Sequence, residues 1–311
     1  MDNNASLNEN TRLAINTERK ADCRKLEECT SSNTLIENSE WPGLNYYLYK
    51  YIYIMILKNK TILITGSATG IGEAMARLFH AQGANVVIHG KEISDVRRVS
   101  NDLGDRVLER TDDLSDSQSP QNLIAATVDA FGGLDGLVNN AAMITRKDLD
   151  SSTPEIFNYD FSVNTRAPLF LIKSALPHLE KAEGNILNIG SINSYCGERN
   201  LLVYSMTKGA LLTMTRNLGD TLHRENGVCV NQFNLGWVLS PNEIKSKIAE
   251  GLPEDWPQKV PPNLAPCGRI LLPEEIARIA LPWVSGETRP VSGSVIDIEQ
   301  FPVIGRNPIK E

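Results

Sequence analysis

The sequence predicts an α/β protein built on a doubly wound parallel sheet. Short apolar runs recur without polar alternation, as in 61–65 and 85–88, which is typical of strands buried on both faces. Stretches with helical spacing of apolar residues separate these runs, and a glycine-rich turn joins the first run to the first helix. The 311 residues, 41% of them hydrophobic, suffice for one domain of about 250 residues plus an extension.

The elements alternate along the chain from residue 58 onward. Strands are expected at 61–65, 85–88, 106–109, 134–138, 185–189, 228–231 and 294–298. Helices are expected from Ile71 to Gly83, at 123–131, 156–179 and 201–225, and from about Pro273. Residues 237–270, rich in Pro, Trp, Glu and Lys, are expected to form a long loop that covers a substrate. Ligands of such a sheet bind at the carboxyl ends of its strands.

Residues 1–57 are expected to be an N-terminal extension, and residues 58–311 a single catalytic domain. The first 40 residues are too polar to fold alone. The tyrosine-rich stretch 45–57 is too short to span a membrane. One interpretation is that this stretch packs on a partner or a membrane surface. The other is that the extension is dispensable and that Met55 is a natural start.

Composition excludes several function classes. A net charge of −7 argues against a nucleic-acid-binding surface, and no apolar run reaches the length of a membrane span. The five cysteines are odd in number and irregularly spaced, and the four histidines lack metal-ligand spacing. We therefore expect no disulfide framework and no metal site, and a reducing, cytoplasmic location. Asp112 and Asp113 are interpreted as loop or nucleotide-binding residues rather than metal ligands.

The first strand leads into a glycine-rich turn that predicts a dinucleotide site. Gly66 permits a tight turn, while Gly70 and Gly72 allow close approach of a pyrophosphate and close packing of the helix on the sheet. The helix N-terminus then offers free N–H groups to the anion. The cofactor-binding residues expected in this turn are Gly66, Ser67, Thr69, Gly70, Ile71 and Gly72.

The end of the second strand bears on the choice of cofactor. A free ribose 2′-hydroxyl usually meets an acidic residue here, but the sequence has Gly90 followed by Lys91. A cation at this position favours the 2′-phosphate of NADP, although the adjacent Glu92 opposes it and NAD stays open. Lys91 could instead begin a solvated helix. His89 is interpreted as a hydrogen-bonded strand-end residue rather than a base-stacking one.

Catalytic chemistry is predicted where a buried strand ends at Ser191. Tyr204 and Lys208 follow at i and i+4, so they share one face of a helix. A phenol exchanges protons at neutral pH only when its phenolate is stabilised, and a neighbouring ammonium with a cationic nicotinamide ring would do this. Ser191 could hold the reacting oxygen against the phenol.

From about 58 to 300 the chain resembles the short-chain dehydrogenase/reductase family. The resemblance is carried by Gly66-x-x-x-Gly70-x-Gly72, Asn139-Asn140-Ala141-Ala142, Asn164, Ser191 and Tyr204-x-x-x-Lys208, in the family's order. It implies a Rossmann-like domain that moves a hydride between NAD(P) and a carbonyl or secondary alcohol, and by analogy a homo-oligomer.

The resemblance also implies residue roles. Tyr204 is the general acid/base, Ser191 orients the substrate oxygen, Lys208 binds the nicotinamide ribose and lowers the pKa of Tyr204, and Asn164 holds a water in a proton relay. Further residues are expected to contact the cofactor or support its site: Asp113, Leu114, Asn139, Ala141, Gly236, Val238 and Ser240.

The sequence departs from the family at three places. Ala142 replaces a glycine, Leu235 replaces the proline before Gly236, and 297–302 replaces a glycine-rich turn. The second change predicts a less rigid loop beside the nicotinamide, and the third leaves the oligomer geometry open.

The substrate is less well defined by the sequence. Asn193 and Trp237 are expected to contact it, and Tyr195, Glu198, Asn242, Trp256 and Arg269 are further candidates, whereas Cys196 is interpreted as structural. This polar and aromatic mixture favours a sugar or polyol. An NAD-dependent alcohol dehydrogenase, a 3-oxoacyl reductase, an epimerase or dehydratase, and a non-catalytic nucleotide sensor are the alternatives.

Overall fold

Seven parallel strands form one sheet in the order β3-β2-β1-β4-β5-β6-β7. The computed structural model describes residues 55–195 and 197–304, so the expectations for residues 1–54 and for Cys196 lie outside the described residues. The strands are β1 (Thr61–Ile64), β2 (Asn85–His89), β3 (Val107–Arg110), β4 (Gly136–Asn139), β5 (Asn185–Ser191), β6 (Cys229–Leu235) and β7 (Val295–Ile298). The doubly wound parallel sheet predicted from the sequence is confirmed.

Helices connect the strands as crossovers. They are α3 (Gly70–Ala81), α4 (Ile93–Leu103), α5 (Ser119–Phe131), α6 (Pro154–Phe161), α7 (Ala167–Ala182), α8 (Leu202–Asn226), α9 (Pro241–Ala249) and α10 (Pro273–Ser285). Three short turns complete the set: a π-helical turn η1 (Ser162–Arg166) and the 3₁₀ turns η2 (Ile192–Ser194) and η3 (Trp256–Gln258). No described helix has the length and apolar character that crossing a membrane requires.

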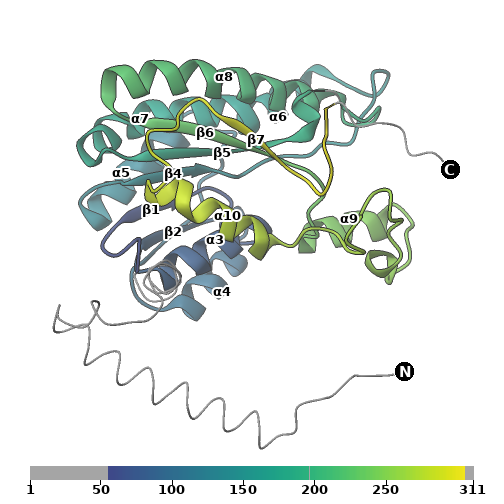
Figure 1. The fold of residues 1–311 in the computed structure, drawn as a ribbon, viewed down its shortest axis with the longest axis horizontal. Helices are drawn as coiled ribbons and strands as arrows, with labels where there is room; N and C mark the ends of the chain where they lie inside the picture. The colour runs from purple at the N-terminus through teal and green to yellow at the C-terminus, as the bar shows by residue number, and fades with distance from the viewer. Residues whose placement is uncertain (1–54, 196, 305–311) are drawn as a thin grey trace, which may run out of the picture. The chain divides into compact units, whose positions relative to one another are not determined.

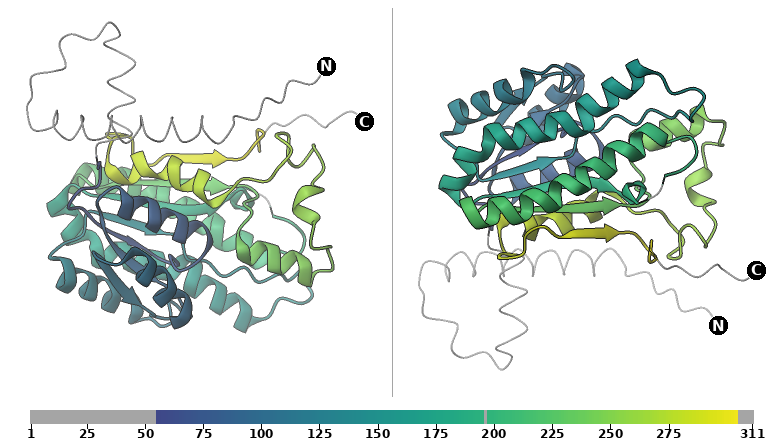
Figure 2. Two further views of the ribbon diagram at one scale, coloured as in Figure 1. Left: turned by 90° about the horizontal axis from the view of Figure 1, so that it is seen from below. Right: turned by 90° about the horizontal axis from the view of Figure 1, so that it is seen from above.

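The helices cover both faces of the sheet (Figures 1 and 2). On one face α3, α4 and α10 pack on the sheet through an apolar cluster that includes Phe79, Val96 and Ile276. On the other face α5, α7 and α8 pack through a second cluster that includes Leu123 and Leu171. Because both faces are covered, the central strands are buried on both sides, which explains why they lack the alternation of a half-exposed strand.

Helix α4 was not among the helices expected from the sequence, and the structure differs from the expectation in three further segments. The helix expected at 156–179 is interrupted by the π-helical turn η1, which separates α6 from α7. The strand expected at 228–231 extends to Leu235, because its polar residues pair inside the protein. The expected loop 237–270 contains α9, whose first turn is capped by Ser240 Oγ accepting from the backbone N–H of Glu243 at 3.1 Å.

Leu57 lies at the start of the folded unit. Its side chain is 1% exposed and belongs to the same apolar cluster as Phe79. Its backbone N–H donates to the carbonyl oxygen of Gln82 at 3.1 Å, next to the end of α3. The folded unit therefore includes Leu57, which the sequence placed in the extension.

A row of buried amides crosses the middle of the sheet. Asn139 pairs in register with Asn188, and Asn188 with Gln232, so their side chains lie side by side on the α8 face. Asn139 Nδ2 donates to Asn188 Oδ1 at 2.8 Å, and Asn188 Nδ2 donates to Thr215 Oγ1 at 2.8 Å. Thr215 Oγ1 lies 2.8 Å from Gln232 Oε1, so a hydrogen-bonded row links three strands and α8.

The strand order places a crevice at one edge of the sheet. β1 lies between β2 and β4, so the chain winds in opposite directions on either side of it. At such a reversal the loops after β1 and β4 separate and leave a crevice at the carboxyl ends. This geometry positions the site described next.

Candidate active site

A cleft of about 1040 Å³ runs along the carboxyl ends of the strands. Most of the residues predicted from the sequence line it: Gly66, Thr69, Gly70, Ile71, Lys91, Asp113, Leu114, Ala141, Ser191, Asn193, Tyr204, Lys208, Gly236, Trp237, Val238 and Ser240. Ser67, Gly72, Asn139 and Asn164 do not line it. The fold thus brings together groups that are up to 174 positions apart, from Gly66 to Ser240.

The turn after β1 is shaped by its glycines. Gly66 and Gly70 have φ values of 65° and 57°, in the left-handed region that side chains disfavour. A Cβ on Gly72 would overlap the carbonyl oxygen of Gly66, so only glycine allows α3 to start this close to the turn. The result is an open cradle at the N-terminus of α3, which suits an anion.

Two residues that were predicted at the cofactor site, Ser67 and Asn139, have side chains that support this turn or the sheet. Ser67 is fully buried, donates to the carbonyl oxygen of Val87 at 2.9 Å and accepts from the backbone N–H of His89 at 2.8 Å. Asn139 lies in the amide row beneath the cleft. Both side chains point into the protein and are held by buried partners, so Asn139 lies where it can support the site from below, and in Ser67 the main chain is the part that faces the turn.

His89 links the turn to the loop after the third strand. Its Nδ1 accepts a hydrogen bond of 3.1 Å from the backbone N–H of Gly66, so the ring proton must lie on Nε2, which donates to the carbonyl oxygen of Asp112 at 2.9 Å. Burial lowers the pKa of His89, which keeps the ring neutral. Sequence reasoning identified a hydrogen-bonded histidine but missed its bond to the glycine turn.

Asn140 performs a similar supporting role from the loop after β4. Its Nδ2 donates to the carbonyl oxygens of Thr65 and Gly66 at 2.8 and 3.2 Å. Thr65 Oγ1 in turn accepts from the backbone N–H groups of Asn140 and Ala141, each at 3.0 Å. Hydrogen bonds therefore connect the two loops that border the crevice. The sequence motif contained Asn140, but spacing alone could not distinguish its role from that of Asn139.

Lys91 stands at the opposite end of the cleft from the catalytic groups. Its Nζ lies 3.5 Å from the hydroxyl of Tyr159 and 3.7 Å from Asp113 Oδ2. The hydrogen bond to Tyr159 raises the pKa of this exposed lysine. A Cβ on Gly90 would come within 2.7 Å of the Cβ of Ala68, so the backbone leaves no room there for an acidic side chain.

Ser191, Tyr204 and Lys208 meet beneath the β5–α8 connection. Ser191 ends β5, while Tyr204 and Lys208 lie one turn apart on α8. The Ser191 hydroxyl interacts with the Tyr204 phenol, and Lys208 Nζ lies 5.6 Å from the centroid of the Tyr204 ring. Lys208 Nζ also donates to the carbonyl oxygen of Ile189 at 2.7 Å. Tyr204 and Lys208 are 8% and 2% exposed.

The expected lowering of the Tyr204 pKa by Lys208 is not produced by the protein groups. Burial raises the pKa of Tyr204 to about 12 and outweighs the hydrogen bond from Ser191, which lowers it. Burial lowers the pKa of Lys208 to about 8. Loss of solvation disfavours the charged form of each group, so the neutral phenol and the neutral amine become more stable relative to the phenolate and the ammonium.

Asn164 occupies the π-helical turn η1. Its Oδ1 accepts from the backbone N–H of Met143 at 2.7 Å, while its Nδ2 donates to Met143 O at 2.8 Å and to Thr207 Oγ1 at 3.1 Å. Both amide hydrogens are thus committed to protein partners. The side chain ties the loop after β4 to α8 three residues from Tyr204, and π-helical turns are frequent at functional sites.

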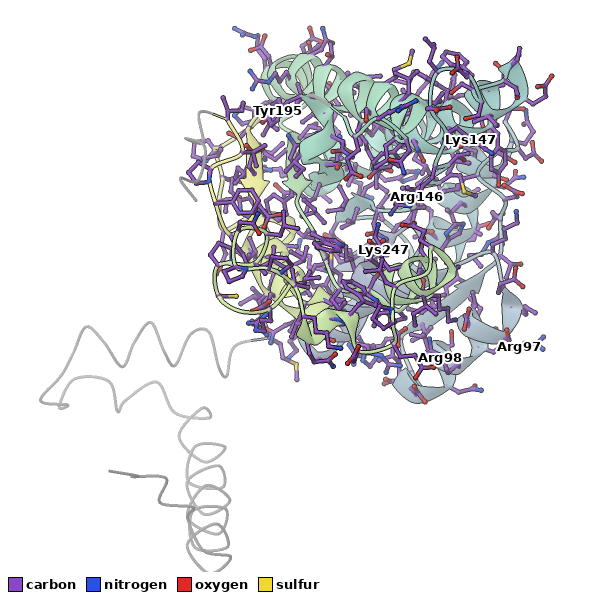
Figure 3. All side chains as sticks on the ribbon, turned by 90° about the vertical axis from the view of Figure 1, so that its right-hand side faces the viewer. Arg97, Arg98, Arg146, Lys147, Tyr195 and Lys247 are labelled. Atoms are coloured by element: carbon purple, nitrogen blue, oxygen red, sulfur yellow. The ribbon has the colours of Figure 1, made fainter. Side chains whose placement is uncertain are left out.

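Charged and aromatic residues from the loop after β4, the β6–α9 loop and α9 line the same cleft as Tyr204. Arg146, from the loop after β4, reaches α9, where its Nε lies 2.9 Å from Glu250 Oε1 and its Nη2 lies 3.6 Å from Glu243 Oε2 (Figure 3). Trp237 Nε1 donates to Glu243 Oε1 at 2.9 Å, and its ring stacks on Trp256 at 5.3 Å. Sequence reasoning missed Arg146 and Glu243, which no recognised motif contains.

The other substrate candidates divide into two groups. Asn193, Glu198 and Asn242 line the cleft, whereas Tyr195, Trp256 and Arg269 do not. Over the described ranges, 55–195 and 197–304, no group of three or more His, Cys, Asp or Glu side chains could hold a metal ion. Asp112 instead pairs with Arg110 at 2.6 Å.

Comparisons with known proteins place these features in a family. Residues 66–300 match the sequence model of a family described as enoyl-(acyl carrier protein) reductase. An uncharacterised oxidoreductase of Bacillus subtilis, YhxC, is 32% identical over 77% of this chain and 86% of its own length. L-fucose dehydrogenase of Mus musculus is 34% identical over 71% of this chain and 81% of its own.

The fold agrees with the sequence match. The crystal structure of 3-ketoacyl-(acyl-carrier-protein) reductase from Brucella melitensis complexed with NADH superposes with a TM-score of 0.69 at 27% identity, over 78% of this chain and 98% of that one. The chain belongs to the short-chain dehydrogenase/reductase family. It is an NAD(P)-dependent oxidoreductase that acts on CH–OH or C=O groups.

The cleft of this dehydrogenase/reductase fits a nicotinamide dinucleotide. Gly66 and Gly70 leave space where a Cβ would touch Ala141 or Ser240, and the same cleft continues past Lys208 to Gly236 and Val238. The turn would hold the pyrophosphate, Lys91 and Asp113 the adenosine end, and Lys208 with the β6–α9 loop the nicotinamide end.

Proposed function

We propose that this enzyme interconverts a carbonyl and a secondary alcohol, with Tyr204 as the general acid/base and a sugar or polyol as substrate. The observation that carries the proposal is the meeting of Ser191, Tyr204 and Lys208 in the cleft that also holds the glycine turn. A bound nicotinamide dinucleotide supplies the hydride, and the protein supplies orientation and one proton.

The proposed mechanism follows from the positions of three side chains. During reduction the Ser191 hydroxyl donates a hydrogen bond to the carbonyl oxygen and holds it beside the Tyr204 phenol. Tyr204 Oη then gives its proton to the developing alkoxide. The ammonium form of Lys208, which lies over the Tyr204 ring, stabilises the phenolate that results. Asn164 keeps η1 against α8 so that a proton relay can pass beside Lys208.

We propose a preference for NADP. Lys91 is an exposed cation at the end of β2, and Gly90 leaves no room for the acidic side chain that would accept a hydrogen bond from a free ribose 2′-hydroxyl. NAD is the second candidate, because Asp113 lies 3.7 Å from Lys91 Nζ and partly offsets its charge. The NADH in the superposed structure belongs to that protein and leaves the preference here as a proposal.

Polar groups around Tyr204 favour a hydroxylated substrate. Asn193, Glu198, Arg146 and Glu243 offer donors and acceptors, and Trp237 offers an apolar ring of the kind on which sugar C–H groups pack. The similarity to an L-fucose dehydrogenase points the same way. The similarity to a 3-ketoacyl reductase makes 3-oxoacyl substrates the second candidate.

One assay tests these proposals together. Purified enzyme is given NADPH or NADH with a panel of aldoses, ketoses and 3-oxoacyl thioesters, and NADP or NAD with the corresponding alcohols. We expect turnover on a sugar or polyol, with higher kcat/KM for the phosphorylated cofactor. Turnover only on the thioesters would reject the proposed substrate class.

We further propose that the enzyme is a cytoplasmic homo-oligomer. Phe157 on α6 and the adjacent Leu169 and Phe170 on α7 are 39–41% exposed, and such apolar side chains favour burial against a second copy. Among the described cysteines Cys229 and Cys267 are free thiols, as is typical of a reducing compartment. Light scattering tests the assembly, and cell fractionation tests the location.

A further inference from the structure

The β6–α9 connection starts at a point where the family's usual proline is absent. Leu235 takes that position, so the sequence predicted a less rigid loop. In the structure the two N–H groups that follow are both bonded. Gly236 N–H donates to the carbonyl oxygen of Ile298 at 3.0 Å, and Trp237 N–H donates to Glu299 Oε2 at 2.9 Å. The acceptors of both hydrogen bonds lie in the segment at the end of β7.

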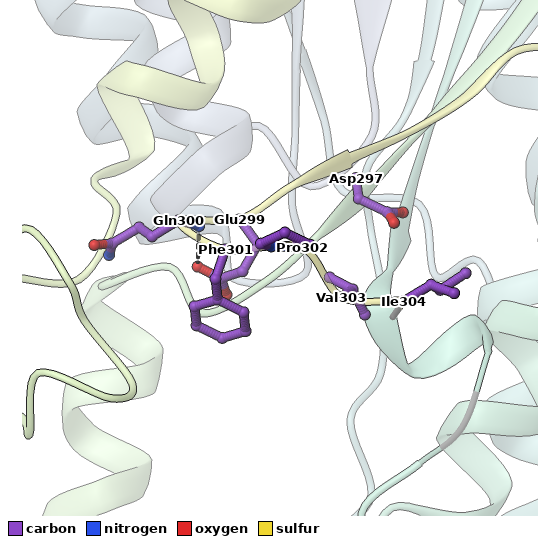
Figure 4. Close-up of a pocket in the computed structure, with 7 residues that line it drawn as sticks. All are labelled: Asp297, Glu299, Gln300, Phe301, Pro302, Val303 and Ile304. Atoms are coloured by element: carbon purple, nitrogen blue, oxygen red, sulfur yellow. Dashed lines mark hydrogen bonds between the residues drawn. The ribbon is translucent and has the colours of Figure 1, made fainter. Parts of the chain in front are cut away.

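The Glu299 carboxylate lies directly against this loop. A Cβ on Gly236 would overlap Glu299 Oε2, so the absence of a side chain at Gly236 makes room for the carboxylate. Its other oxygen, Oε1, accepts from the backbone N–H of Gln300 at 2.6 Å (Figure 4). Glu299, Gly236 and Trp237 all line the active-site cleft. The loop and the carboxylate therefore fit each other closely.

The segment that carries Glu299 is itself anchored. Gln300 Nε2 donates to the carbonyl oxygen of Arg269 at 2.7 Å, and Gln300 Oε1 accepts from the backbone N–H of Cys267 at 3.0 Å. Both partners lie in the loop before α10. Glu299 thus lies between β7 and this loop, and both restrain it. It can therefore hold the backbone N–H of Trp237 in a fixed position.

We propose that Glu299 is a positioning residue that fixes the Gly236–Trp237 backbone for the nicotinamide end of the cofactor. The inference rests on the proposed function, which places that end beside Gly236. A carboxylate that accepts from a backbone N–H forms a stronger bond than a neutral acceptor, so one side chain can restrain a loop that lacks proline. Because Trp237 also stacks on Trp256, the same contact orients the substrate side of the cleft.

Hydrogen exchange measures the proposed contact without any cofactor. In Glu299→Ala the Trp237 amide loses its acceptor, so we expect it to exchange about 10-fold faster or more. Glu299→Gln keeps one acceptor oxygen and is expected to restore most of the protection. Glu225→Ala, which removes an exposed carboxylate near the end of α8, is the matched control and is expected to exchange as wild type.

Ligand binding then distinguishes positioning from general damage. ADP occupies only the adenosine half of the site, so its affinity is expected to be the same in wild type and Glu299→Ala. The affinity for NADPH is expected to fall by about 10-fold or more in Glu299→Ala, with a lower kcat, and to recover in Glu299→Gln. If Glu299→Ala does not fold, the Glu299→Gln variant and the crowded Gly236→Ala variant are compared, and the latter is expected to lose NADPH but not ADP affinity.

Each remaining outcome overturns a defined claim. Unchanged Trp237 exchange and unchanged NADPH affinity in Glu299→Ala would overturn the role of Glu299 and leave the proposed function intact. Equal losses of ADP and NADPH affinity would show that Glu299 is only structural. Failure of the wild-type enzyme to bind either NADPH or NADH would overturn both the proposed function and this inference.

Discussion

Lys208 Nζ lies 5.6 Å from the centroid of the Tyr204 ring and donates its hydrogen bond to the main chain of β5 rather than to the phenol. The two side chains are one helical turn apart and both are buried. Loss of solvation governs both groups: it raises the pKa of Tyr204 to about 12 and lowers the pKa of Lys208 to about 8. A positive nicotinamide ring nearby would add the charge that favours the phenolate.

Replacing Tyr204 with Phe removes the proposed proton donor. We expect kcat to fall by a factor on the order of 10² to 10⁴, while NADPH binding changes little, because the ring still fills its place. Tyr195→Phe is the control, since Tyr195 bonds to Asp297 outside the cleft. Stopped-flow turnover and fluorescence titration measure both quantities. A near-normal kcat in Tyr204→Phe would rule out the assigned role.

The buried amine of Lys208 makes stability depend on pH. Its pKa is about 8 in the folded protein and 10.5 ordinarily, so between these values the unfolded chain binds more protons. Stability therefore rises with pH in this window, by up to about 3 kcal/mol from this group.

The variant Lys208→Met isolates that contribution. The difference in unfolding free energy between wild type and Lys208→Met should shift in favour of wild type from pH 8 towards pH 10. Above pH 10 the raised pKa of Tyr204 acts oppositely, because the unfolded phenol ionises first. Urea titrations at pH 7.5, 8.5 and 9.5 give the slope. A pH-independent difference would contradict the buried, neutralised amine.

Lys91 is predicted to select the cofactor. Lys91→Ala should weaken NADPH binding by about 10-fold and leave NADH binding nearly unchanged, because only the 2′-phosphate uses the charge. Arg97→Ala on α4 removes another exposed cation from the same region and serves as the control. Equal effects on both cofactors would indicate that Lys91 contacts something other than the 2′-phosphate.

Gly72 is predicted to tolerate no side chain. In Gly72→Ala the new methyl group would overlap the carbonyl oxygen of Gly66, so the turn must shift and the affinity for either cofactor should fall sharply. Gly133→Ala is the matched control, because nothing lies within 4 Å of a Cβ there. Isothermal titration with NADPH compares the two. Wild-type affinity in Gly72→Ala would mean that the turn is not the phosphate site.

The boundary of the catalytic domain can be placed by two truncations. A chain that starts at Met55 keeps Leu57 and should unfold at the same temperature as the 311-residue chain. A chain that starts at Asn59 loses Leu57 and should be less stable by about 2 kcal/mol or more, since a large side chain leaves a cavity. Equal melting temperatures for both would place the boundary after Leu57.

The doubly wound sheet was accessible from the sequence, because its central strands are buried on both faces and most crossovers carry an amphipathic pattern. The order of the strands was not predicted, and the crossover helix α4 was missed. The interruption at 162–166 was also not accessible, since a π-helical turn leaves the apolar pattern almost unchanged. The extension of β6 to Leu235 was missed for a different reason. Asn231, Gln232 and Asn234 look solvent-facing in sequence, but their partners lie on α8 and on neighbouring segments.

Within the site, the motif residues were predictable from the sequence, whereas the residues that hold the surrounding loops in place were not. Gly70, Tyr204 and Lys208 follow spacings that local geometry fixes. The contacts of Glu299 with Trp237 and of Arg146 with Glu250 join residues that are 62 and 104 positions apart, so no local pattern encodes them. The pKa of Tyr204 was also inaccessible, because it depends on how completely the fold excludes water from the phenol.

The amide row through Asn139, Asn188 and Gln232 constrains how the strands can assemble. If β5 slipped by one residue against its neighbours, Asn188 would turn towards the apolar cluster of α3 and α10 and would leave its partners unpaired. Misaligned sheets would therefore contain several unsatisfied amides in a dry interior, at a cost of about 1–3 kcal/mol each. The row thus favours the native strand register over registers shifted by one residue.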